Sequence, residues 1–127
     1  MNYGISKTLD ISYEQAIEKV TEELKKQGFG ILTTIDVKET LKKKLDVDFN
    51  KYIILGACNP PFAYEALKAE EQIGLLLPCN VIVYEKNEKT VVSAFNPSII
   101  TFLSDNKKMH ELSVELNALM NKVIDSL

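Results

Sequence analysis

Both cysteines of the chain lie within two residues of a proline, and both are followed by asparagine. Cys58-Asn59-Pro60 ends an apolar run, and Pro78-Cys79-Asn80 repeats the cysteine–asparagine pair twenty-one residues later. A helix is expected to begin at Asn59, where free backbone N–H groups attract anions and lower the pKa of a nearby thiol. The candidate ligand-binding residues are therefore Cys58, Asn59, Pro60, Pro78, Cys79 and Asn80.

Two interpretations of these residues remain open. In the first, both cysteines are small buried residues, Asn59 caps a helix and Asn80 closes a turn. In the second, Cys58 and Cys79 carry out thiol-based redox chemistry or bind a metal ion, which requires the two thiols to meet in space. They would meet if both lie at one end of a sheet, whereas a parallel strand starting at Cys79 would separate them.

Other catalytic signals are missing from the sequence. His110 is the only histidine, and with the two cysteines it gives three soft ligands over 53 positions, without the short-spaced pairs of a structural zinc site. Neither a nucleophile motif of the Gly-x-Ser-x-Gly type nor a phosphate-binding glycine motif occurs. We therefore predict no catalytic residue, no metal ion and no cofactor.

Composition narrows the class of protein. The 127 residues suit one globular domain over residues 1–127, and 46% hydrophobic residues are enough for a core without disulfides. A net charge of -3 argues against nucleic-acid binding, and no apolar run is long enough to cross a membrane. Because residues 1–7 lack the apolar stretch of a secretory signal, we expect a cytoplasmic protein with reduced cysteines.

Hydrophobic periodicity predicts the order β-α-β-α-β-α-β-β-α. Ser12 and Gln15 form a capping box for the first helix, and Gly28 ends it. Strands are predicted at 3–9, 29–35, 51–58, 79–85 and 90–95, and the nearly all-apolar strand 51–58 is expected to be buried on both faces. Helices follow Ser12, Asp36, Pro61 and Asp105, with a short helical turn at Pro97, and residues 73–78 are expected to be extended. The pattern predicts an α+β fold of two layers, with helices packed on a mixed sheet of about five strands. The order of the strands does not follow from the sequence.

The last helix carries a wide apolar face at helical spacing. It includes Met109, Leu112, Leu116, Met120 and Val123. A small sheet need not cover a face of this width, and a second copy of the chain would cover the remainder. The sequence thus raises the hypothesis of a homodimer.

Two segments together resemble the family known as domain of unknown function 302. They are Gly56-Ala57-Cys58-Asn59-Pro60 and Leu75-Leu76-Leu77-Pro78-Cys79-Asn80-Val81, supported by the last hairpin and by Asn96-Pro97. The resemblance covers nearly the whole chain and implies a compact two-layer α/β fold, a dimer and no established activity. The six candidate residues match the motif positions of that family.

These observations favour a non-catalytic module that binds a small molecule or an anion, or that interacts with another protein. The alternative is a thiol-based redox or metal-binding protein that uses Cys58 and Cys79. Neither hypothesis identifies a substrate.

Overall fold

A computed structural model describes residues 2–127 of the chain. One sheet contains all five strands in the order β1-β5-β4-β3-β2. The strands are β1 (Gly4–Leu9), β2 (Gly30–Asp36), β3 (Tyr52–Cys58), β4 (Cys79–Lys86) and β5 (Lys89–Phe95). The α-helices are α1 (Tyr13–Lys26), α2 (Val37–Leu45), α3 (Pro60–Ala69), α4 (Ile100–Leu103) and α5 (Lys107–Asp125), with the 3-10 helices η1 (Glu71–Leu76) and η2 (Pro97–Ile99).

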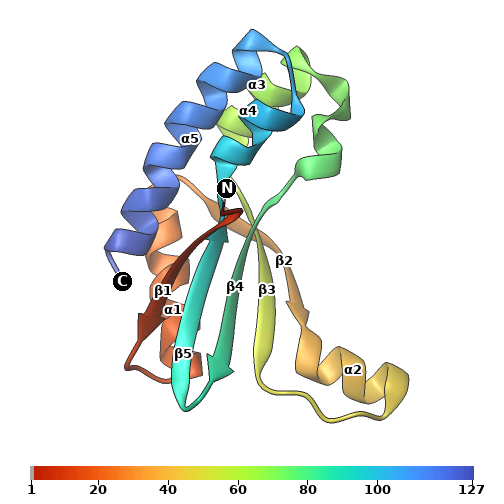
Figure 1. The fold of residues 1–127 in the computed structure, drawn as a ribbon, viewed down its shortest axis with the longest axis vertical. Coiled ribbons are helices and arrows are strands. Elements are labelled where there is room, and N and C mark those ends of the chain that lie inside the picture. Colours follow the sequence, from red (N-terminus) through yellow and green to blue (C-terminus); the bar gives the residue numbers. More distant parts are fainter. Residues whose placement is uncertain (1) are drawn as a thin grey trace.

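The structure confirms the α+β class and the predicted element order, but the sheet is antiparallel throughout rather than mixed. The reason lies in where the connecting helices sit. Helix α2 lies beyond one end of β2 and β3, and α3 with η1 lies beyond the opposite end of β3 and β4 (Figure 1). These helices therefore reverse the chain at the strand ends instead of carrying it back across the sheet, so neighbouring strands run in opposite directions.

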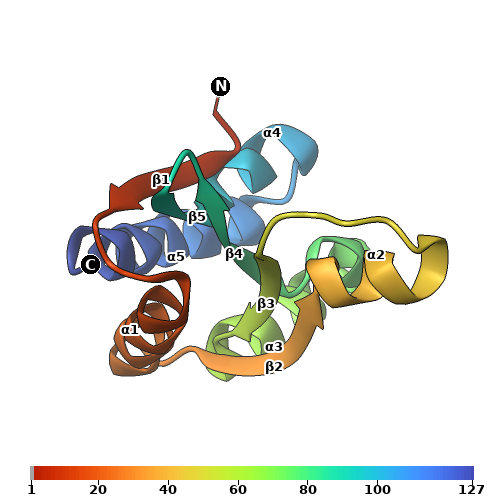
Figure 2. The ribbon, with the colours of Figure 1, turned by 90° about the horizontal axis from the view of Figure 1, so that it is seen from below.

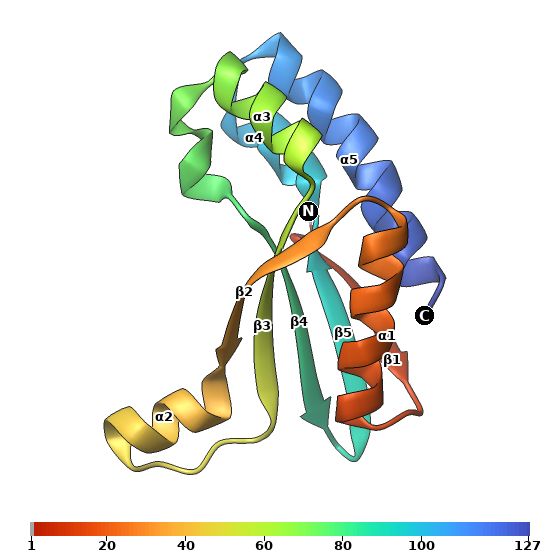
Figure 3. The same ribbon diagram turned by 180° about the vertical axis from the view of Figure 1, so that it is seen from behind.

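Helices α1 and α5 cover one face of the sheet, as the views from below and behind show (Figures 2 and 3). Helix α1 begins with the predicted capping box, in which Ser12 Oγ accepts from the Gln15 backbone and the Gln15 side chain accepts from the Ser12 backbone. It ends before Gly28, whose φ of 86° suits a residue without a Cβ. The predicted boundaries of this helix are confirmed.

Between these helices and the sheet lies a closed core. Its members are buried almost completely and come from α1, the central strands and the C-terminal half of α5; they include Val20, Leu24, Val81, Val83, Val92, Met120 and Val123. A second, smaller cluster holds α3, η1 and α4 against the N-terminal half of α5, through Ala66, Ile73, Ile100, Met109 and Leu112. Phe62 packs against both clusters.

Three local predictions were wrong. Helix α5 is capped by Asn106, whose side chain accepts from the Met109 backbone, and not by Asp105. The segment predicted to be extended before Pro78 forms η1, because Ile73 turns inward as a buried anchor. Strand β3 was predicted to be buried on both faces, but only one face is covered by helices, and residues 52–54 are only half-buried.

The other face of the sheet carries aromatic side chains and no helix layer. Tyr52 and Tyr84 stack with ring centroids 5.2 Å apart and planes 11° from parallel. Phe49 adds a tilted ring 6.3 Å from that of Tyr52. Helix α2, which follows β2, projects away from the sheet and has no buried residue (Figure 2). The apolar face of α5, by contrast, is covered by the chain itself, so the surface on which the homodimer hypothesis rested is already occupied.

Within residues 2–127, no helix has the length and apolar character needed to cross a membrane.

Candidate ligand-binding cavity

A cavity of about 280 Å³ lies where the closed core meets the smaller cluster. Its floor is the end of the sheet, from Ala57 and Cys58 on β3 to Pro78 and Cys79 at the start of β4. Its walls come from α3, η1, α4 and the N-terminal half of α5, which gather above this end of the sheet (Figure 1). Among the described residues that line the cavity, none is charged.

The antiparallel pairing of β3 and β4 brings the two cysteines to the same end of the sheet. Cys79 stands directly opposite Ala57, so Cys58 lies one position beyond that pair. Both cysteines are free thiols; Cys79 is buried and Cys58 is half-buried. Because successive side chains of a strand point to opposite faces, and Ala57 shares its face with Cys79, the strand geometry directs Cys58 differently from Cys79.

Burial raises the pKa of the Cys79 thiol from 9.0 to about 11, and the nearby Cys58 thiol contributes to the same shift. At neutral pH this thiol is therefore protonated. A protonated thiol is a poor nucleophile, so Cys79 presents a small, weakly polar surface to the cavity.

Asn59 occupies the N-cap position of α3, as predicted, but its side chain makes no capping hydrogen bond. Instead, Asn59 Nδ2 donates to the Gln27 carbonyl oxygen at 3.1 Å, which ties α3 to the end of α1. The helix then starts with Pro60 and Pro61, and proline has no backbone N–H. The predicted anion site at this terminus therefore loses two of its donors.

Pro78 lines the cavity, whereas Asn80 does not. A Cβ on Gly56 would meet Thr33 Oγ1 at 2.1 Å and Pro78 Cγ at 2.9 Å, which explains the glycine between these side chains. Asn80, paired with Gly56, is exposed within β4 and closes no turn. Pro60 is also exposed and outside the cavity lining.

Four of the six candidate residues thus line one cavity: Cys58, Asn59, Pro78 and Cys79. Sequence reasoning missed the rest of the wall, which is provided by ordinary apolar positions of four helices. They include Phe62, Ala66, Ile73, Ile100, Met109 and Leu112. The amphipathic spacing of α3 and α5 marks these residues as inward-facing, but it does not distinguish a filled core from a cavity.

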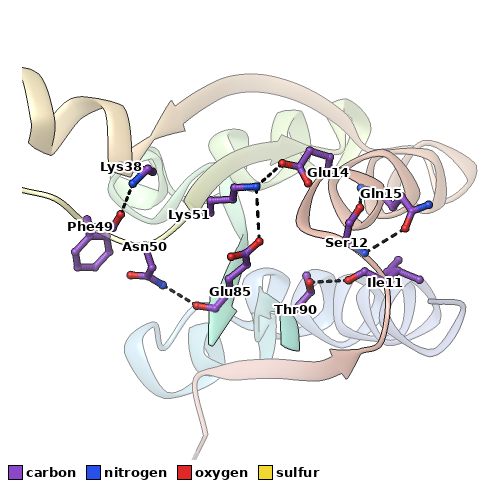
Figure 4. A network of polar contacts seen from close by, with 10 residues as sticks. All are labelled: Ile11, Ser12, Glu14, Gln15, Lys38, Phe49, Asn50, Lys51, Glu85 and Thr90. Carbon is purple, nitrogen blue, oxygen red and sulfur yellow. Dashed lines mark hydrogen bonds and ion pairs between the residues drawn. The ribbon is translucent and has the colours of Figure 1, made fainter. Parts of the chain in front are cut away.

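The opposite end of the sheet is closed by polar contacts (Figure 4). Lys51 Nζ lies 2.7 Å from Glu14 Oε1 and 3.8 Å from Glu85 Oε1, and Thr90 Oγ1 donates to the Ile11 carbonyl. Burial and the nearby carboxylates of Asp36, Glu14 and Glu85 raise the pKa of Tyr13 to about 12. Lys51 thus connects Glu14 of α1 with Glu85 of β4, and the network holds these segments together.

The described residues offer no cluster of side chains suited to bind a metal ion. Among residues 2–127, no group of three or more histidine, cysteine, aspartate or glutamate side chains is placed to hold a metal ion. His110 Nε2 contacts the Ser104 carbonyl oxygen at 2.5 Å, and no cysteine takes part. The histidine is thus engaged in fixing the turn before α5.

Comparisons with known proteins agree with one another. A family model described as "Domain of unknown function DUF302" matches residues 5–127. The crystal structure of an uncharacterized conserved protein DUF302 from Bacillus stearothermophilus is similar, with a TM-score of 0.90, 26% identity and coverage of 98% of each chain. No protein with a curated description matches the chain.

Proposed function

This chain belongs to the family described as domain of unknown function DUF302, and we propose that it is a binding module for a small uncharged molecule held in the cavity beside Cys58 and Cys79. The observation that carries the proposal is a cavity of about 280 Å³ with no charged residue in its lining. Small-molecule sites are concave and lined mostly by apolar side chains with a few polar groups, and this cavity has a lining of that kind.

The chemistry of the lining selects the ligand. Transfer of an ion into apolar surroundings without a partner is strongly unfavourable, so a charged group is excluded from the interior of the cavity. Water gains little there, because a buried water molecule needs two to four polar partners. An engineered apolar cavity of roughly 150 Å³ takes up benzene, so about 280 Å³ accommodates a larger apolar group.

Binding of matched aromatic compounds tests this proposal. We expect toluene to raise the melting temperature and to give a saturable calorimetric signal, whereas benzoate, which has the same ring and a negative charge, does neither. Ala66 lines the cavity and Ala118 is exposed on α5. Ala66→Leu should therefore weaken toluene binding, and Ala118→Leu should retain it. Equal binding of toluene and benzoate, or no binding of either, would contradict the proposal.

The alternative, a thiol-based redox or metal-binding protein, is supported by the location of both cysteines at one end of the sheet. The protonated state of Cys79 and the strand alternation speak against it. A cytoplasmic location, which we include in the proposal, would keep both thiols reduced. Titration with an aromatic disulfide reagent distinguishes the two: one thiol forms a mixed disulfide, and a second thiol within reach displaces the reagent's thiolate to leave an intramolecular disulfide. Rapid formation of that Cys58–Cys79 disulfide in the native protein, with two thiolates released, would favour the alternative.

We also propose that the chain forms a homodimer, through the open sheet face and α2 rather than through α5. A nine-residue helix is marginal on its own in water, and α2 buries none of its residues. Ile35, Leu45, Val47 and Phe49 are exposed around it. The segment 36–50 has equal numbers of acidic and basic side chains, so two copies meet without net repulsion.

Sedimentation measures this directly. A dimer at micromolar concentration is expected, and Leu45→Glu should weaken it at least tenfold by placing a carboxylate in the contact. Leu103→Glu alters an equally exposed leucine of α4 and should leave the dimer unchanged. A wild-type monomer at these concentrations would overturn the proposal.

A further inference from the structure

Strand β2 changes its register beside the cavity. Ile31 pairs with Ala57 and Thr33 pairs with Gly56, so Leu32 is an extra residue with no partner on β3. Such a β-bulge re-aims a side chain, and bulges are frequent next to functional sites. Leu32 is 67% exposed and still lines the cavity. The bulge therefore places a large apolar side chain at the boundary between the cavity and water.

The apolar residues that line the cavity range from fully buried to exposed. Ile73 and Met109 are buried, Phe62 and Leu77 are half-buried, and Leu67 is 43% exposed. Leu67 and Leu32 come from different elements, α3 and β2, and line the same cavity. Exposed apolar residues of β2 and α3 thus belong to the cavity lining, and we place the mouth of the cavity between these two elements.

We propose that the cavity binds the unbranched hydrocarbon chain of a single-tailed amphiphile, whose polar end remains at the mouth beside Leu32 and Leu67. This inference rests on the proposed function and specifies its ligand class. A compact ring would fill the interior and leave Leu32 and Leu67 exposed to water, whereas a hydrocarbon chain would contact the interior and cover these two leucines as well. Scaled from the roughly 150 Å³ that benzene occupies, about 280 Å³ takes a chain of about ten carbons, which leaves no room for a second tail.

The surroundings of the mouth fit an end that is polar and hydrated. Strand β2 is at the edge of the sheet and pairs only with β3, so its outer edge presents free backbone N–H and C=O groups to solvent. A hydroxyl or carboxyl group at the end of a chain meets these groups and water. It therefore keeps its hydrogen bonds while the chain loses contact with water.

Calorimetric titration with 1-alkanols from butanol to dodecanol tests the chain directly. Each methylene that enters the cavity should tighten binding about fourfold, and the gain should stop near ten carbons, when further methylenes remain outside. Decanoate should bind within about tenfold of decanol, because its charge stays at the mouth. An affinity that does not depend on chain length would overturn the inference.

Substitution of Leu32 tests the route through the mouth. Leu32→Ser changes an exposed residue, so the fold should persist, and decanol should bind at least tenfold more weakly while toluene binds unchanged. Leu103→Ser is the control, since Leu103 is 62% exposed and lies outside the cavity lining. If toluene binds and no alkanol does, the ligand class is wrong and the proposed function stands. If neither binds, both fail.

Discussion

The two halves of α5 lie over two different interiors. The C-terminal half places Met120 and Val123 in the closed core, where α1 and the central strands fill the space. The N-terminal half places Met109 and Leu112 against short helical segments, and the cavity remains between them and the end of the sheet. The closed core is filled from two long helices and the central strands, whereas the space beyond the strands is enclosed by the short segments α3, η1 and α4. The C-terminal half of α5 thus contributes to a filled core, and the proposed binding space lies under the N-terminal half.

Leucine truncation in the two interiors gives the largest expected effect. Leu24→Ala should lower the free energy of unfolding by about 3–5 kcal/mol, because its neighbours are fully packed. Leu112→Ala removes the same atoms beside existing empty space and should cost about 2–3 kcal/mol. Urea unfolding of both variants measures the difference. Equal losses would mean that the two interiors are packed alike.

The pH dependence of stability tests the burial of Cys79, which lies between the closed core and the cavity. Its pKa is about 11 in the folded chain against 9.0 as the ordinary value, so the folded state holds a proton that the unfolded state has lost between these pH values. The resulting stability is complete below pH 9 and is lost toward pH 11, by about 2–3 kcal/mol.

The raised pKa of Tyr13 acts in the same direction above pH 10. Urea unfolding from pH 8 to 11 should therefore show a smaller decline for Cys79→Ala than for the wild type. Identical slopes for the two proteins would show that the Cys79 thiol is not protected by burial.

Enlarging an alanine should have opposite effects in the two interiors. Ala16 is completely buried in the closed core, so Ala16→Leu overpacks it and should cost about 1–3 kcal/mol. Ala66→Leu places its extra methyl groups in the cavity and should leave stability unchanged or raise it by up to about 1 kcal/mol. Thermal unfolding checks both, and a destabilised Ala66→Leu protein would argue that the cavity wall cannot accept added atoms.

The smallest expected difference separates the two cysteines. Cys79→Ser introduces a hydroxyl into a buried position and should cost about 1–3 kcal/mol. Cys58 is half-buried, so Cys58→Ser should cost less than about 1 kcal/mol, because solvent reaches the new hydroxyl. Denaturant melts decide between these values. A loss of several kcal/mol at position 58 would make Cys58 a core residue like Cys79.

Much of the fold was predictable from local signals. The Ser12–Gln15 capping box, Gly28, and the hairpin turn between β4 and β5 act over a few residues, and the structure contains all three. The antiparallel pairing was not predictable, because it depends on α2 and α3 lying beyond the strand ends, and periodicity does not report a helix's position relative to the sheet. The N-cap of α5 is Asn106 rather than Asp105, because aspartate and asparagine cap helices about equally well and the sequence does not decide between them.

The candidate site was predictable only in part. The repeated cysteine–asparagine pair led to Cys58 and Cys79, and the shared end of the sheet follows once β3 and β4 pair in antiparallel fashion. Asn80 and Pro60 belong to the same two cysteine–asparagine segments but lie outside the cavity. Strand alternation turns Asn80 toward solvent, and Pro60 is exposed at the start of α3. The Leu32 bulge depends on the register of β2, which one sequence does not specify.

Methionine methyl resonances test the central claim most directly, because Met109 lines the cavity and Met120 lies in the closed core of the same helix. The chain has three methionines, so selective ¹³C-methyl labelling gives a spectrum with few signals. On titration with 1-decanol, the Met109 signal should shift saturably while the Met120 signal stays in place. A shift of both signals, or of neither, would contradict a binding space confined to the N-terminal half of α5.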